Sequence, residues 1–167
     1  MPTQQLRRAA LGAALGLLAT PLVCAHVVLE TKTAPVNSEF KAAFQVGHGC
    51  AGRATTAIEV TLPADITVGP APTKAGWTVS VQRAQLAEGS GAAQATRVTW
   101  SGGPLAHDEF DQFEVLIRTP ATPGTRNFRV LQRCGDVSTD WSEIPAPGQS
   151  RRELKRPAAH LDVVPAL

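Results

Sequence analysis

The stretch TTAIEVTL, residues 55–62, indicates the fold class of this chain. Ile58, Val60 and Leu62 alternate with polar residues, and a period of two places these apolar side chains on one face of an extended strand. Further stretches rich in strand-forming residues lie at 38–46, 77–86, 96–102, 112–119, 127–133 and 158–166. The chain therefore consists mainly of short strands.

The segments between these stretches are dense in glycine and proline, the residues that set turns, as in VGPAPTKAG at 68–76 and TPATPG at 119–124. No internal repeat and almost no helical pattern is present. Short strands at this spacing predict an all-β fold, a β-sandwich of immunoglobulin-like or cupredoxin-like type with about seven to nine strands. Residues 26–167 are expected to form one domain, which is long enough to enclose a sound core.

Residues 1–25 have the features of a secretory signal peptide. Two arginines precede an apolar run at 9–23, and small residues precede the expected cleavage after Ala25. The run is short and rich in alanine and glycine, which argues against a membrane-spanning helix. We expect a periplasmic or secreted protein that is soluble after cleavage and begins at His26.

The charge balance and the missing motifs exclude several function classes. After loss of two arginines with residues 1–25, basic and acidic residues are equal in number, and the arginines are scattered rather than gathered in a stripe. Nucleic acid is therefore not an expected partner, and the basic group at 151–156 is interpreted as a solvated segment. Phosphate-loop, dinucleotide-binding, nucleophile-elbow and zinc-finger motifs are absent from the sequence, so no enzymatic activity is expected.

Two cysteines remain after cleavage, Cys50 and Cys134. In an exported protein such a pair most often forms a disulfide. Closing so long a loop would stabilise the fold by roughly 4 kcal/mol in the chain-entropy account. The alternative is that both thiolates bind copper. A blue-copper site usually adds two histidines and a methionine, and no methionine follows residue 25.

His26 would gain two nitrogen donors on cleavage, its free amine and its imidazole Nδ1, which together close a six-membered chelate on one metal ion. Nitrogen ligands favour copper(II) among the divalent first-row metals. A free terminal amine has a pKa of about 8, so the metal must displace a proton and binding depends on pH. The alternative is a histidine that follows the cleavage point by chance.

Several stretches, taken together, resemble the YcnI-like family of exported copper-binding domains. They are AHVVLE (25–30), VGHGCAGRATTAIEVTLP (46–63), GWTVSV (76–81), VTWSGG (98–103), DEFDQFEVLIRTP (108–120) and LQRCGDVSTDWSEIP (131–145). The resemblance covers nearly the whole chain after residue 25. It implies a cupredoxin-like sandwich with a copper(II) site on the N-terminal histidine, completed by a carboxylate and flanked by a tryptophan. In this sequence the histidine is His26, and Trp141 best matches the tryptophan.

Three acids are candidates for the carboxylate. In a strand, Glu143 would share a face with Trp141, and Asp140 would lie on the other face. Glu30 would share a face with His26. We favour Glu143, and the alternative for each acid is a solvated surface position.

His48 is a further candidate ligand, because a bridge from Cys50 to Cys134 would bring its loop toward the strand of Trp141. The remaining histidines are interpreted as surface residues and the remaining tryptophans as core residues: His107, His160, Trp77 and Trp100.

These features predict an exported copper(II)-binding protein for copper storage, trafficking or homeostasis, without catalytic turnover. The resemblance implies as partner a small periplasmic copper chaperone or a copper transport protein of the membrane. Two alternatives stay open. One is a copper oxidoreductase that activates oxygen at the same terminal histidine, which generally needs a second histidine such as His48. The other is a metal-free sandwich that serves as a scaffold or adhesion module.

Overall fold

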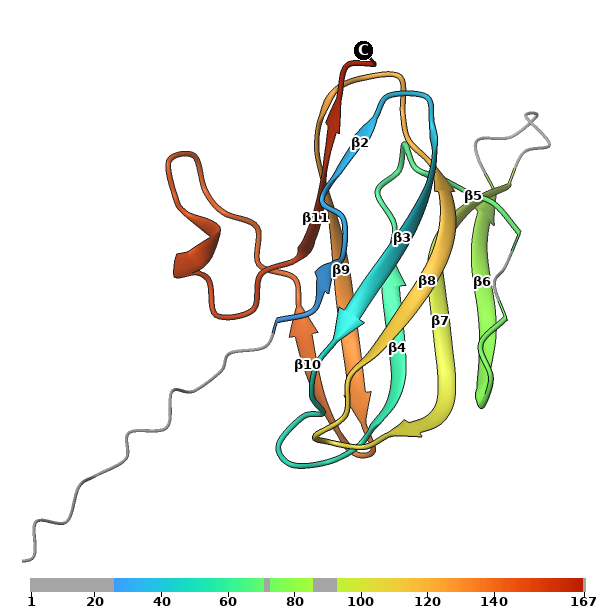
Figure 1. Cartoon of the computed structure of the whole chain (residues 1–167), viewed down its shortest axis with the longest axis vertical. Helices are drawn as coiled ribbons and strands as arrows, with labels where there is room; N and C mark the ends of the chain where they lie inside the picture. The colour runs from blue at the N-terminus through green and yellow to red at the C-terminus, as the bar shows by residue number, and fades with distance from the viewer. Residues whose placement is uncertain (1–25, 71–72, 86–92, 167) are drawn as a thin grey trace, which may run out of the picture.

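Two β-sheets make up the protein in the computed structural model, which describes residues 26–70, 73–85 and 93–166 (Figure 1). The smaller sheet has the order β1-β3-β8-β5, and all its pairings are antiparallel. Its strands are β1 (Val28–Leu29), β3 (Glu39–Val46), β5 (Thr67–Val68) and β8 (Asp111–Arg118).

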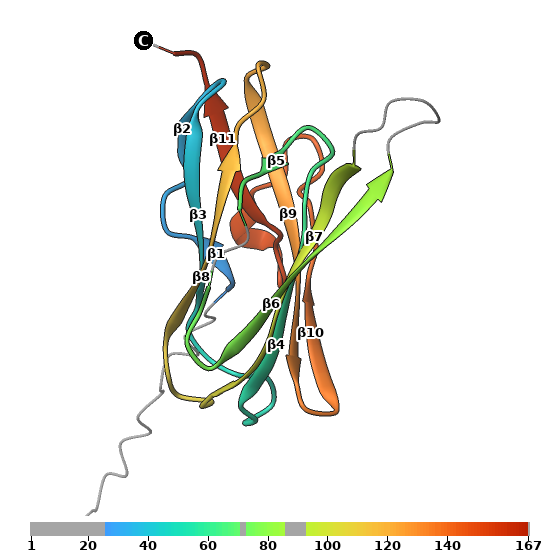
Figure 2. The same cartoon turned by 90° about the vertical axis from the view of Figure 1, so that its right-hand side faces the viewer.

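The larger sheet has the order β2-β11-β9-β4-β7-β6, and β10 also pairs with β9. Its strands are β2 (Thr33–Pro35), β4 (Thr55–Thr61), β6 (Trp77–Gln85), β7 (Ala93–Leu105), β9 (Gly124–Cys134), β10 (Val137–Trp141) and β11 (Ala159–Val164). All pairings are antiparallel except that of β2 with β11. Figure 2 shows β3 and β8 on one side of the molecule and β4, β9 and β10 on the other.

The core lies between the sheets and is built by the alternation seen in the sequence. On β4, Ile58 and Val60 are fully buried while Glu59 is not. Aromatic side chains meet edge-on across the two sheets: Phe44 of β3 contacts Phe128 of β9, with ring centroids 5.5 Å apart. Edge-to-face pairs of this kind add to the free energy gained by burial. The predicted all-β sandwich is thus confirmed.

A disulfide joins Cys50 to Cys134, as predicted. Both sulfurs are in the bridge, which rules out the alternative of two copper-binding thiolates. Cys50 lies in the loop after β3, and Cys134 is the last residue of β9. The bridge therefore holds this loop against the end of β9, next to β10.

The seven predicted stretches correspond to β3, β4, β6, β7, β8, β9 and β11. Three of the four additional strands, β1, β2 and β5, have only two or three residues, too few to show a period. Trp100 is fully buried and Trp77 packs against the core, as expected. In the described residues no helix is long and apolar enough to cross a membrane. The predicted signal peptide lies outside the described residues.

In the basic group at 151–156, Arg152, Lys155 and Arg156 are exposed, as expected of a solvated segment, and only Arg151 departs from that interpretation. Arg151–Glu153 form a 3-10 helix, η1, in the segment that projects between β10 and β11 (Figure 1). Ser150 caps it, and the Glu153 side chain accepts a hydrogen bond from the Ser150 backbone in return. The Arg151 side chain is only half-exposed and donates to Asn127 Oδ1 at 2.7 Å. This hydrogen bond joins the projecting segment to β9.

Candidate metal centre

His26 stands two residues before β1 and is half-buried. β1 pairs with β3, which directs Val27 and Leu29 into the core at 2% and 1% exposure. The imidazole of His26 meets the indole of Trp141 edge-on, with ring centroids 5.8 Å apart and ring planes at 64°. The structure therefore brings together the histidine and the tryptophan that the sequence predicted to be neighbours.

Trp141 is the last residue of β10 and is 4% exposed. Its Nε1 donates a hydrogen bond to Gln132 Oε1 at 3.0 Å. Gln132 is fully buried, and its amide nitrogen donates to the His48 carbonyl oxygen at 2.6 Å and to Thr55 Oγ1 at 2.8 Å. One buried amide thus fixes the indole of Trp141 and the loop that carries His48.

Gln132 was not among the predicted site residues. The signal that marks it is the alternation in β9, where Gln132 occupies an inward position between Val130 and Cys134. A polar side chain at an inward position needs hydrogen-bond partners, and here the partners belong to the site.

His48 also reaches Trp141, with ring centroids 6.3 Å apart and ring planes at 62°. Its Nδ1 lies within hydrogen-bond distance of the carbonyl oxygen of Gly49. A Cβ at Gly49 would lie 1.8 Å from the Arg53 carbonyl oxygen, so only glycine fits this turn. The disulfide draws the loop of His48 toward β10, as expected. The imidazoles of His26 and His48 both contact the indole of Trp141.

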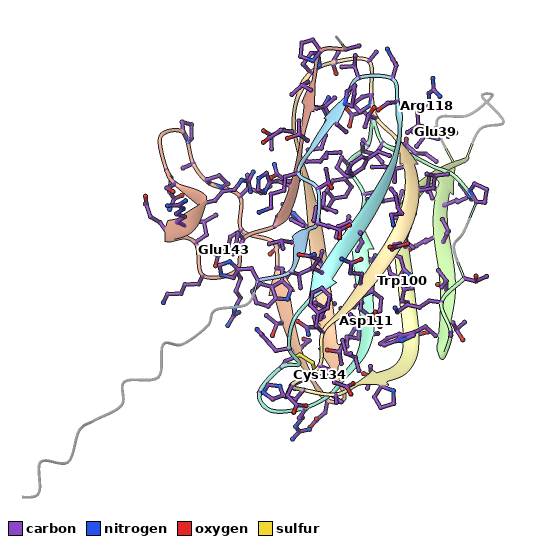
Figure 3. The ribbon with its side chains drawn as sticks, in the orientation of Figure 1. Glu39, Trp100, Asp111, Arg118, Cys134 and Glu143 are labelled. Carbon is purple, nitrogen blue, oxygen red and sulfur yellow. A yellow bond between two sulfur atoms is a disulfide. The ribbon has the colours of Figure 1, made fainter. Side chains whose placement is uncertain are left out.

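Two of the three predicted carboxylates, Glu143 and Glu30, make other contacts. Glu143 lies beyond the end of β10, so its predicted place on the strand face of Trp141 is wrong. Its Oε2 accepts a hydrogen bond from the backbone N–H of Arg156 at 3.1 Å. Figure 3 shows Glu143 at the base of the projecting segment. Asp140 is exposed while Trp141 is buried, as the alternation predicts. Glu30 is exposed and accepts from Gln112 Nε2 at 3.0 Å.

Within residues 26–70, 73–85 and 93–166, no group of three or more His, Cys, Asp and Glu side chains is placed to hold a metal ion. The predicted centre does not require such a group, because two of its donors, the amine and the imidazole, come from His26. The resemblance implies that one carboxylate completes it. The donor chemistry of His26 thus fits copper(II), with His48 as a second imidazole on the same indole.

The two sheets, the single disulfide and the His26–Trp141 contact define the class: a small immunoglobulin-like sandwich with imidazoles gathered at one tryptophan. The chain belongs to the family described as a domain of unknown function (DUF1775), whose model matches residues 26–163. This is the YcnI-like family that the sequence indicated. No curated protein matches the chain.

One solved structure supports the sandwich. A crystal structure of an uncharacterized protein from Nocardia farcinica, described as having an immunoglobulin-like fold, has a TM-score of 0.67 and 28% identity. The match covers 83% of this chain and 97% of that one. The seventh ScaB type I cohesin from Pseudobacteroides cellulosolvens has a TM-score of 0.47 and 7% identity, over 85% of this chain and 93% of that one.

Proposed function

We propose that this protein binds copper(II) through His26 after export and stores the ion or hands it over, without catalytic turnover. The observation that carries the proposal is the His26–Trp141 contact, in a chain that belongs to the YcnI-like family. Cleavage after Ala25 would free the amine, which with the imidazole forms the chelate. Copper is here the cargo of the protein.

The neighbouring residues have separate roles in this proposal. Trp141 holds the imidazole of His26 from one side and is itself fixed by Gln132. Glu143 supplies the carboxylate, and its hydrogen bond to the Arg156 backbone orients it. Delivery requires a partner outside the cytoplasm, a small copper chaperone or a copper transport protein of the membrane.

Copper(II) competition titrations of the exported protein test the proposal, after N-terminal mass analysis has shown the cleavage position. A variant with one glycine before His26 turns the amine into an amide, and His26→Ala removes the imidazole. We expect each change to weaken binding by orders of magnitude and to leave the sandwich folded. Glu143→Gln should weaken it less, by about tenfold, because the chelate remains.

His107→Ala is the matched control, because it removes an exposed imidazole that contacts His48 and not the chelate. It should leave copper affinity within a factor of about two. Electron paramagnetic resonance of the copper(II) protein should show at least two nitrogen ligands. If the glycine-extended variant binds copper(II) as tightly as the exported protein, the amine is not a ligand and the proposal is wrong.

The oxidoreductase alternative has one observation in its favour, the second imidazole of His48 against Trp141. Such an enzyme would consume oxygen when the copper-loaded protein is given a reductant. We expect no consumption beyond that of free copper at the same concentration. Sustained turnover that His48→Ala abolishes would replace the storage proposal by the enzymatic one.

A further inference from the structure

A pocket of about 180 Å³ opens beside His26, between the start of the smaller sheet and the segment that leads into β11. Val27, Val28, Pro157 and Ala158 form its apolar part. Its polar part is basic, with Lys32, Arg151, Arg152 and His160. No aspartate or glutamate is among the described residues that line it. A ligand in this pocket would lie directly against His26.

Arg151 is built into the wall of this pocket. Its guanidinium donates to Asn127 Oδ1 at 2.7 Å and to the Ala158 carbonyl oxygen at 3.5 Å, which are neutral acceptors. Partial burial lowers the pKa of Arg151 despite the attraction of Asp162. The charge is thus partly desolvated without a carboxylate bound to it.

Lys32 and Arg152, the other two cations of the pocket, have little countercharge either. In the part of the chain that the structure describes, none of the ion pairs involves Lys32, Arg151 or Arg152. Burial lowers the pKa of His160, and Arg151 and Lys32 lower it further, although Asp162 opposes them. Asp162 itself accepts from Thr125 Oγ1 at 2.6 Å. The positive potential in the pocket is therefore only partly neutralised.

We propose that this pocket binds carboxylate groups, either of a free polycarboxylate or of an acidic segment of a protein partner. An arginine fork matches a carboxylate geometrically, and charge-assisted hydrogen bonds of this kind are among the strong ones. Because His26 lines the same pocket, the bound carboxylate lies beside the proposed copper centre. Carboxylate oxygens also bind copper(II), so a copper-carrying chelator or partner would dock with its cargo next to the chelate.

The test uses the exported protein free of copper, so that its outcome does not depend on the proposed function. Citrate, a hexapeptide of glutamate and aspartate, and inorganic phosphate are titrated at low ionic strength and followed by backbone amide chemical shifts. We expect citrate or the peptide to shift the amides of Val27, Val28 and Ala158. Binding of citrate would show that a free polycarboxylate is enough to occupy the pocket. Tighter binding of the peptide would show that the pocket prefers an acidic segment of a protein partner.

Variants decide whether the basic residues of the pocket are responsible. Arg152→Gln and Lys32→Gln should each weaken binding by about tenfold, the effect of losing one charge-assisted contact. Arg151 is left unchanged because it also bonds to Asn127. Lys155→Gln removes an exposed charge that lies in the same segment and does not line the pocket, and it should change binding by less than about twofold.

Three results would overturn the proposal. One is the absence of binding of citrate and peptide up to about 10 mM. Another is an equal loss in Lys155→Gln, which would show a general charge effect. The third is phosphate binding as tight as that of citrate, which would show that the pocket does not select carboxylates. Copper affinity measured separately on the same variants keeps a failure here distinct from a failure of the copper proposal.

Discussion

Replacing Gln132 by methionine tests how the site is held together. The change keeps the approximate length of a fully buried side chain and removes its three hydrogen bonds, to Trp141 Nε1, the His48 carbonyl and Thr55 Oγ1. The two sheets and the disulfide are untouched by it. The variant therefore isolates the contribution of one buried amide.

The size of the effect follows from what is left without a partner. The indole N–H of Trp141 and the hydroxyl of Thr55 are both buried, and a buried polar group without a partner costs about 1–3 kcal/mol. Thr55 keeps a weak contact with Cys134 Sγ at 3.8 Å, which limits the free-energy cost of losing its hydrogen bond to Gln132. The apolar methionine offsets part of the loss. We expect the free energy of unfolding to fall by about 3 kcal/mol.

Urea unfolding of the disulfide-intact protein, followed by tryptophan fluorescence and circular dichroism, measures this change. Gln82→Met on the edge strand β6 is the control, because Gln82 is exposed and its replacement should cost less than about 0.5 kcal/mol. Where Gln132→Met is still folded, its copper(II) affinity should fall because Trp141 is no longer fixed. If Gln132→Met unfolds within about 0.5 kcal/mol of the unmodified protein, the amide does not hold the site.

Three further perturbations follow from the structure. Cys50→Ala combined with Cys134→Ala should lower the free energy of unfolding by about 4 kcal/mol and retain copper binding; loss of copper binding in the folded variant would contradict this. Because burial lowers the pKa of His160 below its ordinary 6.5, the folded state binds this proton less readily than the unfolded state. The contribution of neutral His160 to the free energy of unfolding is therefore complete above pH 6.5. It is lost as the pH falls from there through the folded-state pKa. Between pH 7.5 and pH 5, the free energy of unfolding measured with urea should fall less in His160→Asn than in the unmodified protein. An equal fall in both proteins would show that His160 is not the source of this pH dependence. Asp140→Asn should leave copper(II) affinity unchanged in competition titrations, because Asp140 is exposed and faces away from Trp141; a tenfold loss would make Asp140 the ligand.

The sequence predicted the sheets because the relevant signals are local. Alternation along 55–62 decides which side chains face inward, whatever strand lies alongside. The disulfide followed from two cysteines in a chain expected to be exported. The pairing of His26 with Trp141 came from the family resemblance, because no local pattern connects residues at opposite ends of the chain.

The position of Glu143 shows what the tertiary structure decided. β10 pairs with one end of β9 and stops at Trp141, which lies opposite Val130. β11 pairs with the other part of the same edge, and its Ala159 lies opposite Phe128. With that edge occupied, the chain leaves β9 after Trp141, and Glu143 forms an isolated parallel bridge with Pro157 instead. The alternation expected for Glu143 therefore no longer applies.

The sequence alone predicted seven of the eleven strands that the structure describes and the bridge, because these rest on a local pattern and on cysteine count, whereas the choice of His26 and Trp141 as central residues rests on resemblance. Only the tertiary structure decided that Gln132 fixes Trp141 and that Arg151 lines a pocket beside His26. Both contacts join segments whose proximity depends on strand order and on where β10 ends. The alternation of apolar and polar residues within one strand carries no information about which other strand pairs with its edge.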